Sequence, residues 1–307
     1  MKSTKYYVGL DIGGTTIKCG IVDRQGAILC QDKVNTRVNL GIDRILDDIY
    51  DLIDRLCKSN DISMSSIVGI GVGSPGIINN KGVLLYSNNL KCQNVDIKQH
   101  LQDRFGMSTY VANDADAAAL GEALFGSGGK YDNVLFLIVG TGLGGGYVSH
   151  GRLFSGGNGI GMELGHTVIY EGGRLCSCGL HGCMEAYCSA ISLINIAKQE
   201  LGKTELDLMD IWSNYEDSSM RAIIDKYIQH FAIGVINFIN IFRPDIVLIG
   251  GGASHTGDLF LQLLERAVGD RYYGAKVGNR VKFAYAQLQN AAGIIGAACL
   301  AMQDTTR

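Results

Sequence analysis

The sequence predicts an α/β protein of two similar domains, and two observations carry this prediction. A glycine-rich turn flanked by apolar, strand-like runs occurs twice, in residues 6–22 and again in residues 134–154. Segments with the three-to-four-residue spacing of amphipathic helices follow these units. The chain has 307 residues, 47% of them hydrophobic, which is enough to bury a large core. The repeated unit indicates two copies of one α/β domain with both glycine turns directed at a common cleft.

In the first half, apolar runs bounded by turns predict strands, and periodic apolar positions predict helices. The expected strands are residues 6–11, 17–22, 27–34, 67–72 and 109–112. Residues 42–56 alternate an apolar face with Asp and Arg, which predicts an amphipathic helix. Asp96 should cap a short helix that Gly106 closes. The last strand then delivers Asn113 and Asp114 to an alanine-rich helix.

The second half repeats this order. A strand, a glycine turn and a returning strand are expected over residues 134–139, 140–146 and 147–154. A helical pattern over residues 218–242 stops before Pro244, and a strand over residues 245–249 runs into three glycines. An alanine- and glycine-rich helix closes the chain at residues 291–302.

These elements predict two domains. The first comprises residues 1–117 together with a C-terminal helix at about residues 291–307. The larger second domain comprises residues 118–290 and contains a cysteine-rich segment, residues 163–185.

Composition and charge exclude several classes of function. The 27 basic and 30 acidic residues give a net charge of −3, which provides no broad positive field for nucleic acid. No apolar run approaches the roughly 20 residues that cross a bilayer, and no signal-like core follows Met1, so we expect a cytoplasmic protein without a membrane partner. Nine cysteines in a reducing compartment indicate buried thiols and a metal site rather than disulfides.

The cysteine-rich segment has the composition of a zinc site. One imidazole and three thiolates are a ligand set that Zn²⁺ takes in closed structural sites. The candidate ligands are His166, Cys176, Cys178 and Cys183. Gly179 and Gly182 would supply the bends that let neighbouring cysteines converge. Glu163 and Glu185 flank the ligands and could hold hydroxyl groups. The alternative is a loop of ordinary thiols with a solvated histidine, but closely spaced Cys and His in a reducing compartment more often bind metal.

The two glycine turns suit phosphate binding. Residues 140–145 have the G-x-G-x-x-G spacing of dinucleotide-binding folds, but a strand rather than the required helix follows them. The sequence also has no P-loop motif. Backbone N–H groups and the hydroxyls of Thr15, Thr16 and Thr141 can instead hold phosphates from two sides. Either turn alone could equally serve only the geometry of a hairpin.

The cysteine-rich segment carries the motif E-x-G-H followed by C-x-C-G-x-x-G-C-x-E. This pattern resembles the ROK family of sugar kinases and sugar-responsive repressors, and the resemblance extends over nearly the full chain. It implies that the histidine and three cysteines bind structural zinc. It also implies that Glu163, His166 and Glu185 bind sugar hydroxyls.

The N-D-A sequence that begins at Asn113 is similar to a second motif of the ROK kinases. The resemblance implies that Asp114 is the general base that receives the hydroxyl proton during phosphoryl transfer. The family often has Asn where this chain has Asp116. We interpret Asp116 as a residue of the first helical turn that the helix dipole favours, rather than as a second base.

The paired glycine turns resemble the actin and hexokinase superfamily, in which two ribonuclease H-like domains flank an active-site cleft. The resemblance implies an ATP site whose phosphate contacts are Gly13, Gly14, Thr15, Thr141, Gly142 and Gly144. Gly251, in the glycine patch of residues 250–252, would lie by the adenosine. Asp11 would orient the Mg²⁺ complex through water, since Mg²⁺ keeps much of its hydration shell. The alternative for Asp11 is a satisfied structural carboxylate.

Further matches concern the sugar pocket. Gly76 in a G-x-P-G element and Asn89 in an N-L element resemble sugar-contacting loops of the family, and Asn113 adds another polar group. Lys91 departs from the pattern at the pocket rim. The sequence E-A-Y-C-S from Glu185 is close to that of bacterial glucokinases. The resemblance implies ATP-dependent phosphorylation of the 6-hydroxyl of a hexose, with glucose favoured; the alternatives are N-acetylmannosamine, allose, mannose, fructose or a β-glucoside.

Two other classes of function are alternatives to a kinase. A sugar-responsive ROK repressor would carry a helix-turn-helix before the first glycine turn, where only ten residues precede Asp11. An actin-like ATPase would need no sugar pocket, and the glutamates that flank the zinc segment argue against it. We therefore expect a hexose and ATP as partners, no nucleic acid, and, by family resemblance, a homodimer or homotetramer.

Overall fold

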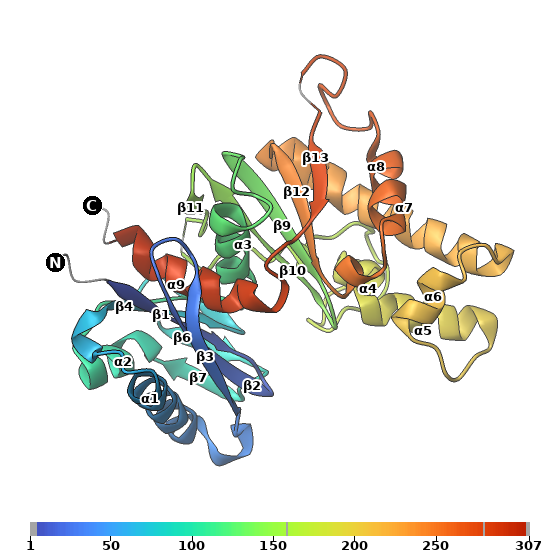
Figure 1. The fold of residues 1–307 in the computed structure, drawn as a ribbon. Helices are drawn as coiled ribbons and strands as arrows, with labels where there is room; N and C mark the ends of the chain where they lie inside the picture. The colour runs from blue at the N-terminus through green and yellow to red at the C-terminus, as the bar shows by residue number, and fades with distance from the viewer. Residues whose placement is uncertain (1–4, 158, 279, 305–307) are drawn as a thin grey trace. The chain divides into compact units, whose positions relative to one another are not determined.

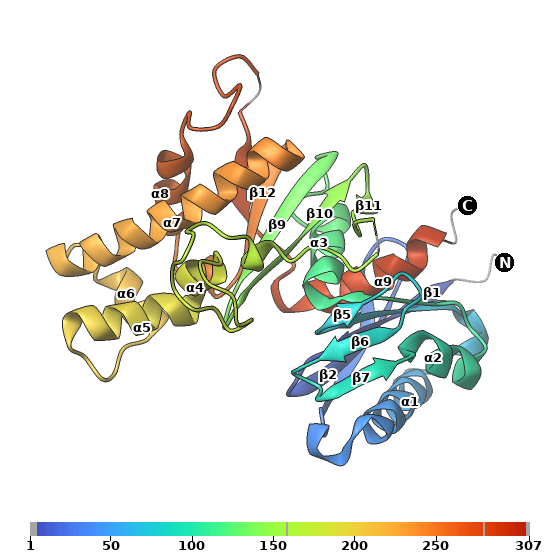
Figure 2. The ribbon, with the colours of Figure 1, turned by 180° about the vertical axis from the view of Figure 1, so that it is seen from behind.

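The computed structural model describes residues 5–157, 159–278 and 280–304, and it confirms the α/β fold class with two mixed sheets (Figures 1 and 2). The chain divides into two compact units. The first unit comprises Met1–Gly129, Gly146–Met162 and Leu288–Arg307, and the second comprises Lys130–Gly145 and Glu163–Gln287. Compared with the domains expected from the sequence, residues 118–129 and 146–162 pack with the first unit.

The first unit contains a five-stranded sheet in the order β3-β2-β1-β4-β8. Its strands are β1 (Tyr6–Ile12), β2 (Thr16–Val22), β3 (Ile28–Asn35), β4 (Ile67–Ser74) and β8 (Thr109–Asn113). The first three strands pair antiparallel, whereas β4 and β8 extend the sheet parallel to β1. In this register Asp11 lies opposite Gly73, and Ser74 lies opposite Asn113. The carboxyl ends of β1, β4 and β8 therefore bring Asp11 and Asn113 to one edge of the sheet.

Helices cover both faces of this sheet, as Figure 1 shows. The helices α1 (Ile42–Ser59) and α2 (Ile97–Phe105) pack on one face, where their apolar side chains join Leu10 in the larger core. The last helix, α9 (Ala292–Asp304), contributes Ile294 to a smaller core on the other face. Strand residues with alternating orientation thus bury both sides of the sheet.

Glycines in the strands let α9 lie close to the sheet. A Cβ atom at Gly9 would overlap the carbonyl oxygen of Ile294, and one at Gly71 would overlap that of Ala297. Any side chain at these positions would push the helix away. The helix α3 (Asp114–Phe125) packs beside α9, which explains why all of α3 belongs to the first unit.

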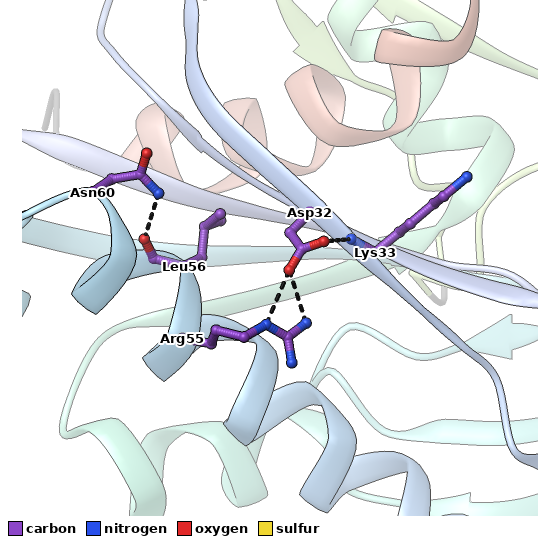
Figure 3. Close-up of polar contacts among 5 residues, drawn as sticks. All are labelled: Asp32, Lys33, Arg55, Leu56 and Asn60. Atoms are coloured by element: carbon purple, nitrogen blue, oxygen red, sulfur yellow. Dashed lines mark hydrogen bonds and ion pairs between the residues drawn. The ribbon is translucent and has the colours of Figure 1, made fainter.

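An ion pair ties α1 to the edge strand β3 (Figure 3). Arg55 donates from Nε and Nη2 to Oδ2 of Asp32 at 3.0 and 2.8 Å, and Oδ1 of Asp32 accepts the Lys33 amide at 2.8 Å. The side-chain hydrogen bond from Arg55 lowers the pKa of Asp32 below its ordinary value. At the end of α1, Asn60 donates to the Leu56 carbonyl at 2.8 Å. Because Arg55 and Asp32 are partly exposed, their ion pair contributes little to stability, and the apolar face of α1 holds the helix on the sheet.

Smaller elements complete the first unit. A three-stranded antiparallel sheet consists of β5 (Ile77–Ile78), β6 (Leu84–Ser87) and β7 (Cys92–Val95). Short 3-10 helices are η1 (Val38–Leu40), η2 (Met64–Ser66) and η5 (Gln289–Ala291). The predicted caps of α2 are confirmed: Asp96 accepts the Gln99 amide, and Gly106 takes a left-handed conformation with φ 65°.

The second five-stranded sheet has the order β11-β10-β9-β12-β13. Its strands are β9 (Asn133–Val139), β10 (Leu143–Ser149), β11 (Arg152–Leu153), β12 (Ile246–Gly251) and β13 (Lys282–Tyr285). The expectation of one returning strand over residues 147–154 is wrong. His150 and Gly151 have φ angles of 49° and 71°, so the chain turns after β10 and returns as the short β11.

The remaining helices belong to the second unit. They are η3 (Leu164–His166), α4 (Glu185–Cys188), α5 (Ala190–Leu201), α6 (Leu208–Ser213), α7 (Ser218–Phe242), η4 (Gly252–His255) and α8 (Leu259–Val268). The bounds of α7 match the sequence prediction: Asp217 caps its first turn, and Arg243 takes a left-handed conformation before Pro244. Within the described ranges, no helix combines the length and apolarity needed to span a membrane.

Candidate active site

The first glycine turn joins β1 to β2 and is held by its own hydrogen bonds. The Gly13 amide donates to the Thr16 carbonyl at 2.9 Å. Thr36, from the loop after β3, donates its hydroxyl to the Gly13 carbonyl at 2.6 Å and its amide to the Thr15 carbonyl at 2.8 Å. These bonds hold the turn in one conformation through its own backbone and Thr36.

Asn89 lies beside this turn. A Cβ atom at Gly14 would be 3.4 Å from that of Asn89, an ordinary contact. Both residues line a cavity of about 730 Å³, which also receives Arg37 and Lys91. The structure thus places one sequence-predicted sugar residue, Asn89, next to the predicted phosphate turn. Of the two cations that line the cavity, Arg37 is paired with Asp48.

Asp11 sits between a cation and a helix end. Its Oδ2 lies 3.2 Å from Nζ of Lys18, the residue opposite it in the β1–β2 register. A Cβ atom at Gly293, the second residue of α9, would be 2.6 Å from the Asp11 carboxyl carbon. The carboxylate therefore approaches the N-terminus of α9, where the helix dipole favours negative charge.

Asn113 and Asp114 form the junction between β8 and α3. Asn113 caps α3, because its Oδ1 accepts the Ala115 amide at 2.9 Å. Its Nδ2 donates to the Gly76 carbonyl at 3.1 Å, which ties the loop after β4 to the same junction. Asp114 is the first residue of α3, is partly exposed, and accepts the Ala115 amide at 2.9 Å. The structure thus brings Gly76, Asn113 and Asp114 together.

Gly76 is required where it stands. Its φ is 122°, and a Cβ atom there would overlap the Tyr86 carbonyl oxygen. Asp116, also in the first turn of α3, is 4% exposed, and its carboxylate lies against Gly161, where a Cβ atom would overlap Oδ2. Asp116 therefore faces the protein interior rather than solvent.

The second glycine turn joins β9 to β10. The Gly140 amide donates to the Gly142 carbonyl at 3.0 Å, and the Gly140 carbonyl accepts the Ala190 amide at 3.0 Å. Thr141 is exposed at the tip. Gly251, at the end of β12, has a φ of 77°, and a Cβ atom there would overlap the Val139 carbonyl oxygen. The turn and the later glycine patch therefore meet at the end of β9.

The four candidate zinc ligands converge. Their ligand atoms all lie within 4.8 Å of one another. Nδ1 of His166 is 3.6 Å from Sγ of Cys176, and the Sγ atoms of Cys178 and Cys183 are 3.7 Å apart. A tetrahedral zinc ion with Zn–S bonds of about 2.3 Å spaces its sulfur ligands about 3.7 Å apart. The cluster therefore has the spacing and the donor set of a structural zinc site.

The thiols of this cluster differ in acidity. Desolvation by burial raises the pKa of Cys176 and raises that of Cys183 to about 12. The Leu180 amide lowers the pKa of the exposed Cys178 by hydrogen bonding to its sulfur. Zinc binds thiolates, so loading the cluster must release protons, and the exposed Cys178 gives up its proton most easily.

Two glutamates border the cluster. Glu163 precedes η3, and desolvation raises its pKa; the nearby charge of Glu185 adds to this rise, and that of His166 opposes it. Glu185, the first residue of α4, accepts the Ser177 hydroxyl at 2.7 Å with Oε1 and the Leu143 amide at 3.0 Å with Oε2. Both carboxylates keep further lone pairs for hydroxyl groups.

Three residues outside the recognised motifs contact predicted site residues. Lys18 pairs with Asp11, Thr36 fixes the first turn, and Ser177 bonds to Glu185. Lys18 could have been found by counting the hairpin register back from the turn at residues 13–15, because directly opposed residues share a face. Ser177 has a positional signal, since it stands between two ligand cysteines. Thr36 belongs to no motif of the sequence.

Known proteins are similar to this chain over nearly its whole length. The ROK family model matches residues 7–304. A xylose repressor from Caldicellulosiruptor bescii is 33% identical over 310 residues, which are 96% of this chain and 77% of the repressor. A glucokinase from Halalkalibacterium halodurans is 33% identical over 321 residues, which are 98% of this chain and 96% of that protein.

Among solved structures, a ROK family glucokinase from Streptomyces griseus in complex with glucose and AMPPNP is similar to this chain. Its TM-score is 0.80 at 30% sequence identity, and the match covers 97% of this chain and 99% of that one. The likeness extends over both compact units rather than over one of them.

Proposed function

Because this chain belongs to the ROK family, we propose that it is an ATP-dependent sugar kinase that phosphorylates the 6-hydroxyl of a hexose, with glucose as the first candidate. The observation that carries the proposal is the His–Cys₃ cluster with Glu163 and Glu185 beside it. This arrangement offers carboxylates and an imidazole to several neighbouring hydroxyl groups of one sugar. The glucokinase relatives and the neighbour with bound glucose and AMPPNP support the same activity.

Asp114 is the proposed general base. The hexose 6-hydroxyl oxygen would attack the γ-phosphorus of ATP, the bond from that phosphorus to the bridging oxygen of ADP would break, and Asp114 would take the hydroxyl proton. The side chain suits this task because it projects from a rigid strand–helix junction that Asn113 caps. The bond between Asn113 and Gly76 would keep the neighbouring sugar-contacting loop in place.

The phosphates would lie against the two glycine turns. The proposed contacts are Gly13, Gly14, Thr15, Thr141, Gly142 and Gly144, with Gly251 near the adenosine. Magnesium, when bound with ATP, would neutralise charge on the phosphates. Asp11 would orient that complex through water, and its partner Lys18 adds a positive charge to the same edge of the sheet.

Zinc has a structural role in this proposal. His166, Cys176, Cys178 and Cys183 would hold it, and the ion would fix the loop from which the three sugar-binding side chains project. The proposal also includes a cytoplasmic location, where thiols stay reduced, no nucleic-acid partner, and a homodimer or homotetramer.

A panel assay tests the function. Purified protein would be given ATP and each of glucose, N-acetylmannosamine, allose, mannose, fructose and a β-glucoside, with polyphosphate as a second donor. Glucose should give the highest kcat/KM, and ³¹P and ¹³C NMR should place the phosphate on carbon 6. Turnover of none of these sugars, or phosphate on another carbon of glucose, would refute the proposal.

A sugar-responsive regulator is the second candidate, because a xylose repressor is as similar to this chain as the glucokinase is. A regulator without kinase activity would bind a sugar, xylose included, and would form no sugar phosphate in the same panel. Calorimetric titration with xylose and glucose, run beside the turnover assay, separates the two functions.

A further inference from the structure

The zinc cluster and the second glycine turn share one carboxylate. Glu185 follows the last ligand cysteine by two positions, and its side chain spans from the zinc loop to the turn. Oε1 accepts the Ser177 hydroxyl at 2.7 Å and lies 3.6 Å from Sγ of Cys176. Oε2 accepts the Leu143 amide at 3.0 Å. All of these residues belong to the second unit.

The turn is shaped to receive this carboxylate. A Cβ atom at Gly142 would lie 2.5 Å from Oε2 of Glu185, so a side chain at that position would displace the carboxylate. On its other side, the Leu143 carbonyl oxygen fills the space that a side chain at Gly165 would occupy. Leu143 is thus held between Glu185 and the E-L-G-H motif. The glycines at positions 142 and 165 permit this close approach.

The backbone that follows Glu185 is hydrogen-bonded to the turn at a second point. The Ala190 amide donates to the Gly140 carbonyl at 3.0 Å, and the Ser192 hydroxyl donates to the Glu185 carbonyl at 3.0 Å. A carboxylate that accepts two hydrogen bonds has one rotamer rather than several, and its charge strengthens both bonds. A shift of the zinc loop would therefore reach the amide of Leu143 through a single side chain.

We propose that Ser177 and Glu185 form a positioning link through which the zinc loop sets the conformation of the glycine turn at residues 140–144. Ser177, between two zinc ligands, fixes Oε1 of Glu185, and the other oxygen fixes Leu143. Zinc loading therefore pre-organises the nucleotide-binding turn as well as the sugar-binding side chains. A sugar hydroxyl that uses a remaining lone pair of Glu185 would act on the same link. The nucleotide and sugar parts of this inference rest on the proposed function.

Hydrogen exchange tests the link without turnover or nucleotide. In the zinc-loaded protein, Ser177→Ala should speed exchange of the Leu143 amide about threefold to tenfold, because the freed carboxylate leaves its acceptor position more often. Ser177→Thr keeps the hydroxyl and should restore the wild-type rate. Ser213→Ala, an exposed serine of the same unit, should leave the rate unchanged. Exchange in β12 is the internal reference.

Two further measurements sharpen the result. Chelation of zinc from the wild-type protein should speed exchange of the same amide at least as much as Ser177→Ala does. Combining Ser177→Ala with Glu185→Ala should add nothing to Glu185→Ala alone, because the alanine leaves neither oxygen of the path in place. Wild-type exchange at Leu143 in Ser177→Ala, or additive effects in the double variant, would overturn the link.

If the link sets the conformation of the glycine turn, breaking it should weaken nucleotide binding. The dissociation constant for AMPPNP with Mg²⁺, measured by calorimetry, should rise about threefold to tenfold in Ser177→Ala and stay at the wild-type value in Ser177→Thr. A wild-type protein that fails to bind AMPPNP would end the proposed kinase function, whereas the exchange rates would still decide whether the link exists.

Discussion

Lys18 and Asp11 face each other across the first hairpin, with Nζ of Lys18 3.2 Å from Oδ2 of Asp11. The pair is partly buried, and it stands at the strand edge to which Asn113 also belongs. A lysine at this point keeps the Asp11 carboxylate in one place and adds positive charge where phosphates are proposed to lie. Because a partly exposed ion pair contributes little to stability, we expect the pair to matter mainly for the proposed binding of phosphates.

Replacing Lys18 tests this role. Lys18→Met keeps the aliphatic stem and removes the charge, so KM for MgATP should rise about threefold to tenfold while kcat for the hexose changes less. Lys33→Met is the matched control, because Lys33 lies directly opposite Lys18 on the neighbouring strand and is exposed. Equal effects of the two changes would indicate general electrostatic attraction and would refute a specific role for the pair.

Asp114→Asn should separate binding from chemistry. The amide keeps the shape and the helix-capping contacts but cannot take a proton, so kcat should fall about 10²-fold or more. The dissociation constant for glucose should stay within a few-fold of the wild-type value. Asp43→Asn, an exposed change in the first turn of α1, controls for loss of a helix N-terminal charge. A kcat near that of the wild type would remove Asp114 from the mechanism.

Cys178→Ser should lower the zinc content and raise KM for the hexose, because three proposed sugar-binding side chains depend on the zinc loop. Elemental analysis and steady-state kinetics are the measurements. Cys92→Ser, in β7 and outside the cluster, should change neither quantity. Wild-type protein prepared with metal and without chelator should contain about one zinc ion per chain; a content far below that would contradict the zinc site itself.

We expect His230 to make the free energy of unfolding depend on pH. Desolvation lowers its pKa from 6.5 to about 4, and its Nδ1 is buried without a hydrogen-bond partner among the described residues. The native state keeps this imidazole neutral, whereas the unfolded chain binds a proton below about pH 6.5. The unfolding free energy should therefore decrease as the pH falls from about 6.5 to about 4.

Replacing the imidazole isolates this contribution. His230→Phe keeps a ring against Tyr170 and Tyr187, whose ring centroids lie 5.3 and 4.9 Å from that of His230. Urea unfolding of both proteins between pH 4 and pH 7 gives their unfolding free energies, and the value for the wild type minus that for His230→Phe should decrease as the pH falls. Parallel curves over that range would show that His230 does not titrate on unfolding. Any acid release of zinc from the proposed site would be common to both proteins, so it would cancel in the difference.

The sequence predicted the elements whose signals are local. The apolar periodicity of α7 and its flanking Asp217 and Pro244 gave both ends of that helix. The strands β1, β2 and β9 were expected within one residue of their bounds. The convergence of the zinc ligands was also predictable, because a 23-residue segment leaves four ligands little room to lie elsewhere. These predictions needed no knowledge of distant contacts.

Other features depend on contacts that no local pattern records. The hydrogen bond between Glu185 and Leu143 joins residues 42 positions apart in the sequence, and no motif near either residue predicts it. The end of β10 was missed because a histidine, rather than the usual glycine or asparagine, takes the first left-handed position of that turn. The packing of α3 with α9 was also missed, since it depends on close approach of backbones at Gly121 and Gly296. A local pattern could not reveal this packing, and the domain boundaries given from the sequence stay a prediction.

The packing of α9 on Gly9 and Gly71 affects the order in which parts of the chain can fold during synthesis. Residues 6–74 supply four strands of the first sheet, but the helix that covers one face comes from residues 292–304. A ribosome therefore completes the whole second unit before the first can bury that face. Until α9 is made, the apolar residues of the strands around Gly9 and Gly71 lack the helix that buries them in the folded protein, and the second unit has its whole sequence available to fold first.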